Sequence, residues 1–201
     1  MTSTETVSAA PPESRAARLV TDHFEPKNWI LVVTLVVGWH TDGLAGVGWG
    51  LFGALFAAVI PVLFIKLGVR RGTWADRHLG QRQQRLVVMV FIICSVTTGT
   101  LLMGLMDAPS AMIALIAAMV STLVVLMAIT FAWKISVHAA VSSGSIAILA
   151  LDYGPWPLAA FPLVVLVGWS RIALRDHTPA QVVAGAALGA AVAGATFGLL
   201  R

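Results

Sequence analysis

Residues 86–133 read LVVMVFIICSVTTGTLLMGLMDAPSAMIALIAAMVSTLVVLMAITFAW, and Asp107 is the one charged residue among them. About 20 apolar residues cross the hydrocarbon core of a bilayer as a helix, so each half of this stretch is long enough to span a membrane. The segment between the halves, Asp107 to Ser110, contains Pro109 and fits a tight turn. The stretch therefore predicts a hairpin of two membrane helices.

The same pattern extends over most of the chain. Hydrophobic residues make up 58% of the 201 residues and charged residues 11%, with a mean hydropathy of +0.89, whereas charged residues are about 25% of a soluble domain. A water-soluble globule is excluded on this ground. We expect an all-α, polytopic transmembrane helical bundle of about six to seven membrane helices, because uncharged runs lie near residues 29–39, 43–65, 86–106, 108–133, 135–151, 153–170 and 178–200.

Two regions follow from this distribution. Residues 1–28 are rich in Ser, Thr, Ala, Pro and charge and have no apolar core of their own, which predicts a disordered or interfacial N-terminal tail. Residues 29–201 form a single transmembrane domain. Within it, residues 40–43 are polar enough to form a turn, and Gly185 and Gly189 form a small-residue pattern that lets helices pack closely.

The basic residues are unevenly distributed. If the seven runs alternate across the membrane, twelve of the thirteen cations lie on one side, and only Arg201 lies on the other, with Asp42, Asp107 and Asp152. The positive-inside rule then predicts a multi-pass protein of the cell membrane whose basic side faces the cytoplasm. A net charge of +4 placed in this way indicates a membrane surface and not nucleic acid as the partner.

Three polar clusters adjoin the apolar runs on that side, at residues 76–85, 133–138 and 170–181. They combine cations, histidines and hydroxyl groups. Arginine and lysine suit the charge of a phosphoryl group, and histidine suits covalent or proton chemistry. In the third cluster, Thr178, Pro179 and Gln181 fit a helix start with a capping box. A phosphate bound at that helix N-terminus would lie beside His177.

These clusters resemble the motifs of the type-2 phosphatidic acid phosphatases, a family related in its active site to glucose-6-phosphatase and the vanadium haloperoxidases. Its third motif is Ser-Arg, five residues, then His, a spacing that Ser170, Arg171 and His177 have, with Gln181 in place of the family's Asp. Its second motif is usually Pro-Ser-Gly-His, of which Ser136 and His138 remain. The resemblance covers roughly residues 66–190 and is closest to a small bacterial branch.

The first motif of that family, Lys, six residues, Arg-Pro, is not matched here. Arg82 and Arg85 resemble a degenerate equivalent, and Lys134 is a substitute for its lysine. The resemblance implies a phosphatase that needs no metal and no cofactor and that hydrolyses a lipid phosphate or an isoprenoid (di)phosphate through a phosphohistidine.

The resemblance also implies roles for single residues. His177 would be the nucleophile and His138 the general acid. The phosphate-binding residues would be Arg171, Ser136, Lys134, Arg82, Arg85 and Ser170. Gln181 would accept a hydrogen bond from the nucleophile, and Asp176 would supply the negative charge that Gln181 lacks. Many relatives act on the outer face of the membrane, so the face that holds the site stays open.

Two alternatives share these residues. One is a non-catalytic membrane protein, either a transporter or a pseudophosphatase that keeps an anion site without turnover. The other is a lipid phosphotransferase that passes the phosphoryl group to an acceptor other than water.

Overall fold

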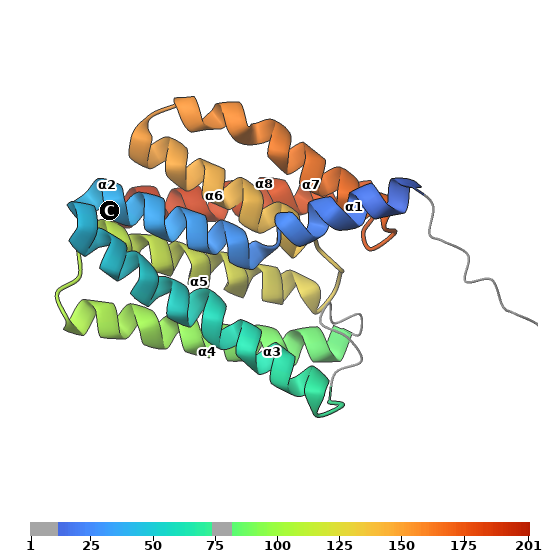
Figure 1. Ribbon diagram of the computed structural model, residues 1–201, viewed down its shortest axis with the longest axis horizontal. Helices are drawn as coiled ribbons and strands as arrows, with labels where there is room; N and C mark the ends of the chain where they lie inside the picture. Colours follow the sequence, from blue (N-terminus) through green and yellow to red (C-terminus); the bar gives the residue numbers. More distant parts are fainter. Residues whose placement is uncertain (1–11, 74–81) are drawn as a thin grey trace, which may run out of the picture.

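A computed structural model describes residues 12–73 and 82–201 of the chain, and the elements in this part are all helical. Figure 1 shows a bundle whose long helices run roughly side by side. In chain order the elements are α1 (Pro12–His23), α2 (Pro26–Ala54), the π-helix η1 (Leu55–Val59), α3 (Ile60–Arg70), α4 (Arg82–Leu105), α5 (Ser110–Thr130), α6 (Val137–Tyr153), the 3₁₀-helix η2 (Trp156–Ala160), α7 (Phe161–Ala173) and α8 (Pro179–Leu200).

The predicted hairpin of residues 86–133 is confirmed. Helices α4 and α5 pack against each other and are joined by a short turn in which Asp107 has a φ of 55°. The Ala108 N–H donates to the Met103 carbonyl at 3.0 Å, which closes the end of α4, and Pro109 is the N-cap of α5.

The predicted turn at residues 40–43 is confirmed as well, although it lies inside α2. Asp42 and Gly43 have non-helical backbone angles, and Gly43 has a φ of 52°. A Cβ atom on Gly38 would overlap the backbone of Gly46, so the two sides of the turn lie in direct backbone contact. Helix α2 therefore consists of two antiparallel segments, which Figure 1 shows doubling back at the end of the bundle near the C-terminus.

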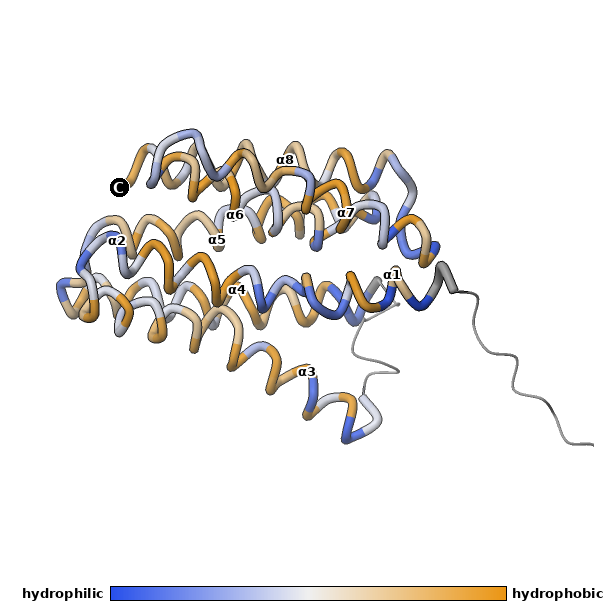
Figure 2. Tube along the Cα trace, turned by 45° about the horizontal axis from the view of Figure 1, so that its top comes forward, coloured by the Kyte–Doolittle hydropathy of each residue, from blue (hydrophilic) through white to orange (hydrophobic). Residues whose placement is uncertain are grey.

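Five helical stretches in the described part of the chain are long and apolar enough to cross a membrane. The first, Arg15–Arg70, contains the reversal at Asp42 and Gly43 and supplies two apolar segments. The shorter apolar helix Val137–Tyr153 adds another. These seven segments agree with the predicted all-α polytopic bundle, and Figure 2 shows apolar residues along the helices with polar residues toward their ends.

Within the predicted tail of residues 1–28, residues 12–23 form the helix α1. This helix packs against α7. Ala17 and Thr21, one turn apart, are 0% and 2% exposed. Among the described side chains of α1 these two are the buried ones, and the high polar content of residues 1–28 led to the prediction of a tail. Residues 1–11 lie outside the described part, and an interfacial position for the tail stays a prediction.

Helices α6 and α8 make the most extensive helix pair. A Cβ atom on Gly185 would lie 2.5 Å from the Ser136 carbonyl oxygen, and one on Gly189 would overlap the backbone of Ala140. The glycines thus allow the backbones to touch, as predicted from their spacing. This contact also fixes the start of α6, which carries His138, against the start of α8, which follows His177.

We expect Gly189→Ala to destabilise the protein by about 1–3 kcal/mol, the usual cost of overpacking a rigid contact. Gly194→Ala is the matched control on the same helix, because its Cβ would meet Ala147 at an ordinary 3.7 Å. Thermal unfolding in detergent measures both variants. Equal midpoints for the two would contradict the close α6–α8 contact.

Candidate functional site

The helix ends that carry the basic residues gather at one end of the bundle, opposite the chain's C-terminus (Figures 1 and 2). This agrees with the predicted one-sided charge for the residues that the structure describes. Arg77 lies in the segment 74–81, outside the described part. The basic end therefore brings together residues that are far apart in the sequence, such as Lys27 and His177.

A cavity of about 440 Å³ opens into the bundle from this end. Six of the predicted site residues line it: Arg85, Lys134, His138, Arg171, Asp176 and His177. The same cavity continues between apolar side chains as far as Val96, Ile148 and Ala193. The stretch of α6 from His138 to Ile148, both in its wall, rises about 15 Å. The cavity thus has a charged head and a long apolar body.

The end of α7 positions two of these residues. Arg175 has a φ of 56°, and its N–H donates to the Ile172 carbonyl at 2.8 Å, while the Asp176 N–H donates to the Arg171 carbonyl at 3.1 Å. These two bonds form a Schellman motif, a common way to end a helix. The sharp turn brings the Asp176 carboxylate back to Arg171, with Nη2 and Oδ2 2.9 Å apart.

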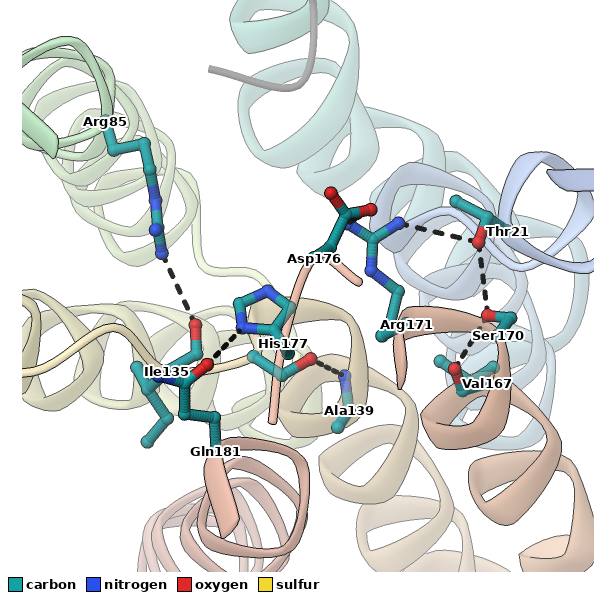
Figure 3. Close-up of polar contacts among 11 residues, drawn as sticks. Thr21, Arg85, Ile135, Ala139, Val167, Ser170, Arg171, Asp176, His177 and Gln181 are labelled. Atoms are coloured by element: carbon teal, nitrogen blue, oxygen red, sulfur yellow. Dashed lines mark hydrogen bonds and ion pairs between the residues drawn. The ribbon is translucent and has the colours of Figure 1, made fainter. Parts of the chain in front are cut away.

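The start of α8 orients His177. Thr178 and Gln181 form the predicted capping box, with the Thr178 N–H donating to Gln181 Oε1 at 3.1 Å. Since Oε1 only accepts, the His177 Nδ1 that lies 3.3 Å from it must carry the proton. The neutral ring then has its lone pair on Nε2, so this nitrogen is the one able to attack phosphorus. Figure 3 shows the contact.

The pKa of His177 is lowered from 6.5 to about 4. Burial is the largest cause, and the positive charges of Lys134 and Arg171 add to it, while the hydrogen bond to Gln181 acts in the opposite direction. Because a lowered pKa favours the neutral form, almost all of the imidazole is uncharged at neutral pH. The ring is thus available as a nucleophile at neutral pH.

We expect the His177 ring protons to titrate near pH 4 in the empty protein, measured by NMR in detergent. The His177→Gln variant identifies the signal among the five histidines. In Lys134→Met one of the neighbouring charges is removed, so the midpoint should move upward. A wild-type midpoint at the ordinary value of 6.5 would contradict both the burial and the nearby cations.

Helix α6 positions His138 as its second residue. Ser136 is the N-cap and accepts a hydrogen bond from the Ala139 N–H at 3.3 Å, which Figure 3 draws. The Ser136 N–H in turn donates to the Gln181 carbonyl at 3.3 Å. One backbone contact therefore ties the helix that carries His138 to the residue that holds His177.

Two further cations complete the charged head. Arg85 on α4 donates from Nη2 to the Ile135 carbonyl at 3.3 Å. The pKa of Lys134 is lowered by its burial and then by Arg85, while Asp176 raises it. Both cations line the same cavity, where they can act on one bound anion.

Two of the remaining predicted residues, Ser136 and Ser170, do not line the cavity. Both are 0% exposed. The hydroxyl of Ser136 caps α6, and that of Ser170 donates to the Val167 carbonyl at 2.7 Å. The two serine hydroxyls are therefore not placed to contact a phosphate in the cavity directly. Helix α4 begins at Arg82, whose side chain lies outside the described part.

Sequence reasoning missed Thr21. Its hydroxyl donates to Ser170 Oγ at 3.1 Å and accepts from Arg171 Nη1 at 3.4 Å. It also missed Lys27 and Lys66, which line the cavity. Thr21 lies in a polar segment with no recognisable motif, so no signal in the sequence could have indicated it.

The arrangement provides a neutral histidine with an available Nε2, a second histidine in the same cavity and several cations around it. Such a site can bind a phosphoryl group and attack it. Among known proteins, residues 109–201 match the family model of the PAP2 superfamily. No curated protein and no solved structure matches the chain.

Proposed function

We propose that this chain, whose residues 109–201 belong to the PAP2 superfamily of type-2 phosphatidic acid phosphatases, hydrolyses a lipid phosphate or an isoprenoid (di)phosphate in the cell membrane. The reaction runs through a phosphohistidine on His177 and uses no metal and no cofactor. The family match of residues 109–201 and the apolar helices support a membrane protein of a phosphatase family.

The observation that carries the proposal is the shape of the cavity. Its charged head, with Arg171 and Lys134, suits a phosphate, and its apolar body suits a hydrocarbon tail. A water-soluble phosphate ester would leave the apolar body unfilled. A lipid whose head stays at the membrane surface would fill both parts.

The residues divide the chemistry in two steps. In the first, Nε2 of His177 forms a bond to phosphorus while the bond from phosphorus to the ester oxygen breaks, and His138 gives that oxygen a proton. In the second, His138 takes a proton from water, whose oxygen attacks phosphorus and releases His177 and inorganic phosphate. Arg171, Arg85 and Lys134 stabilise the charge that spreads over the phosphoryl oxygens.

The test uses the full chain in detergent, with EDTA present, and lysophosphatidic acid labelled in its phosphate. We expect release of inorganic phosphate and a labelled protein whose label is stable in base and lost in acid, as for a phosphohistidine. The label should be missing in His177→Ala. No release from any lipid phosphate at high protein concentration would overturn the proposal and favour a non-catalytic anion-binding protein. Label that reaches an added alcohol instead of water would favour a phosphotransferase.

A second prediction concerns the tail. Ala118 on α5 is 0% exposed and lines the deep part of the cavity. We expect Ala118→Phe to lower kcat/KM about ten- to a hundredfold for palmitoyl lysophosphatidic acid, because a ring there costs about 1–3 kcal/mol of packing with the tail. The octanoyl substrate should be much less affected, since its tail is shorter.

The matched control is Val165→Phe, which places a ring on an outward position of α7 that is 64% exposed. It should change neither substrate. Equal losses on the long and the short substrate in Ala118→Phe would mean that the tail does not occupy this cavity.

A further inference from the structure

Helix α1 lies outside the part of the chain that matches the family, residues 109–201, yet it touches the site. It packs on α7 with Thr21 2% exposed. The Thr21 hydroxyl sits between Ser170 and Arg171, two consecutive residues of α7. An element far away in sequence thus contacts a residue of the proposed phosphate site.

The direction of each hydrogen bond in this contact is fixed. A hydroxyl has one hydrogen and two lone pairs. The Ser170 hydroxyl donates its hydrogen to the Val167 carbonyl at 2.7 Å. Toward Thr21 it can therefore only accept. Thr21 therefore donates to Ser170 at 3.1 Å, and its lone pairs remain for the Arg171 guanidinium at 3.4 Å. Figure 3 shows this series from Arg171 through Thr21 and Ser170 to Val167.

Both terminal nitrogens of the Arg171 guanidinium have partners, whereas its Nε has none among the described residues. The residue is 5% exposed, its Nη1 donates to Thr21 and its Nη2 contacts Asp176 at 2.9 Å. Its Nε is buried with no hydrogen-bond partner among the described residues. A buried donor without a partner is costly, and a phosphate offers the oxygens that two adjacent guanidinium donors bind best.

We propose that Thr21 is a positioning residue of the phosphate site: its hydroxyl, ordered by Ser170, fixes Nη1 of Arg171 so that Nε and Nη2 are presented to a phosphoryl group. The inference rests on the proposed function for the identity of the anion. It assigns Ser170 a role through Thr21 in place of direct contact with phosphate. It also makes α1 part of the site.

The test measures equilibrium binding of inorganic phosphate to the full chain in detergent, which does not require turnover. Thr21→Val keeps the shape of the side chain and removes the hydroxyl. We expect it to weaken phosphate binding about tenfold, the value of one hydrogen bond to a charged group. Thr21→Ser keeps the hydroxyl and should bind phosphate as the wild type does.

Thr34→Val is the matched control, since Thr34 is also fully buried but donates only to Leu31 of its own helix. It should leave phosphate binding unchanged. Thermal unfolding of each variant separates positioning from support of the fold: a structural role would lower the midpoint and leave the dissociation constant of the folded protein unchanged, which would overturn the inference. Unchanged binding in Thr21→Val, or equally weak binding in Thr21→Ser, would overturn it too.

Should Thr21→Val not fold, Ser170→Ala removes the acceptor that orders the Thr21 hydroxyl. We expect it to weaken phosphate binding severalfold, and wild-type affinity in Ser170→Ala would contradict the inference. The proposed function fails separately, through absent phosphate release in a protein that still binds phosphate and responds to Thr21→Val.

Discussion

His177→Ala is expected to lower phosphate release from lysophosphatidic acid by about ten-thousand-fold or more, the scale on which loss of a covalent nucleophile acts. The cause is the loss of Nε2, the ring nitrogen left with a lone pair when Nδ1 donates to Gln181. The loss should be in kcat, since the cations that we propose to bind phosphate remain. Initial rates of phosphate release in detergent measure it.

His138→Ala is the companion variant that separates the two histidines. A general acid contributes about a hundred- to ten-thousand-fold with a poor leaving group. With para-nitrophenyl phosphate, whose leaving group is stable as an anion, no proton is needed. We therefore expect His138→Ala to lose activity on the lipid and keep most of it on the aryl phosphate, whereas His177→Ala loses both. Equal losses on both substrates in the two variants would contradict these roles.

Much of the fold could be predicted because a membrane restricts the choices. Charge-free runs long enough to span it must form helices, so the hairpin around Asp107 and the reversal near Asp42 followed from hydropathy and polar turns. The capping box could be predicted from the residue types and the spacing of Thr178 and Gln181 alone. Helix α1 was missed because its segment is rich in polar and charged residues and it packs on α7, a partner far away in the sequence.

The candidate site likewise contains residues that could be predicted from the sequence and contacts that could not. Arg171 and His177 could be identified because their spacing of six residues matches a known motif. In the structure, the Schellman motif at the end of α7 and the capping box at the start of α8 fix their relative position. Ser170 shares their motif, but its side chain points to Thr21, because adjacent helical residues face different directions. The pairing with Thr21 is a tertiary contact that no local pattern encodes.

Asp176 has a position that the sequence left open. It does not pair with His177, and its carboxylate contacts Nη2 of Arg171 at 2.9 Å. A bound phosphoryl group would compete with that carboxylate for the same donor. The ion pair therefore balances the charge of Arg171, while Gln181 holds His177, the proposed nucleophile.

Arg171→Lys tests how far the site depends on the shape of the guanidinium as well as its charge. A lysine keeps one positive charge and can still pair with Asp176, but it cannot offer two adjacent donors to a phosphoryl group. We expect kcat/KM for lysophosphatidic acid to fall about a hundred- to a thousandfold, the usual cost of losing a donor to a developing oxyanion.

Arg175→Lys is the control in the same turn, because Arg175 is exposed and lies outside the cavity wall. It should keep wild-type kcat/KM, so that a loss confined to Arg171→Lys reports on the phosphoryl group and not on the turn. Since Thr21 would then face an ammonium in place of Nη1, adding Thr21→Val to Arg171→Lys should cost much less than it costs the wild type. Wild-type kcat/KM in Arg171→Lys would mean that a positive charge at this position is sufficient. The orientation of the guanidinium by Thr21 would then have no effect on activity.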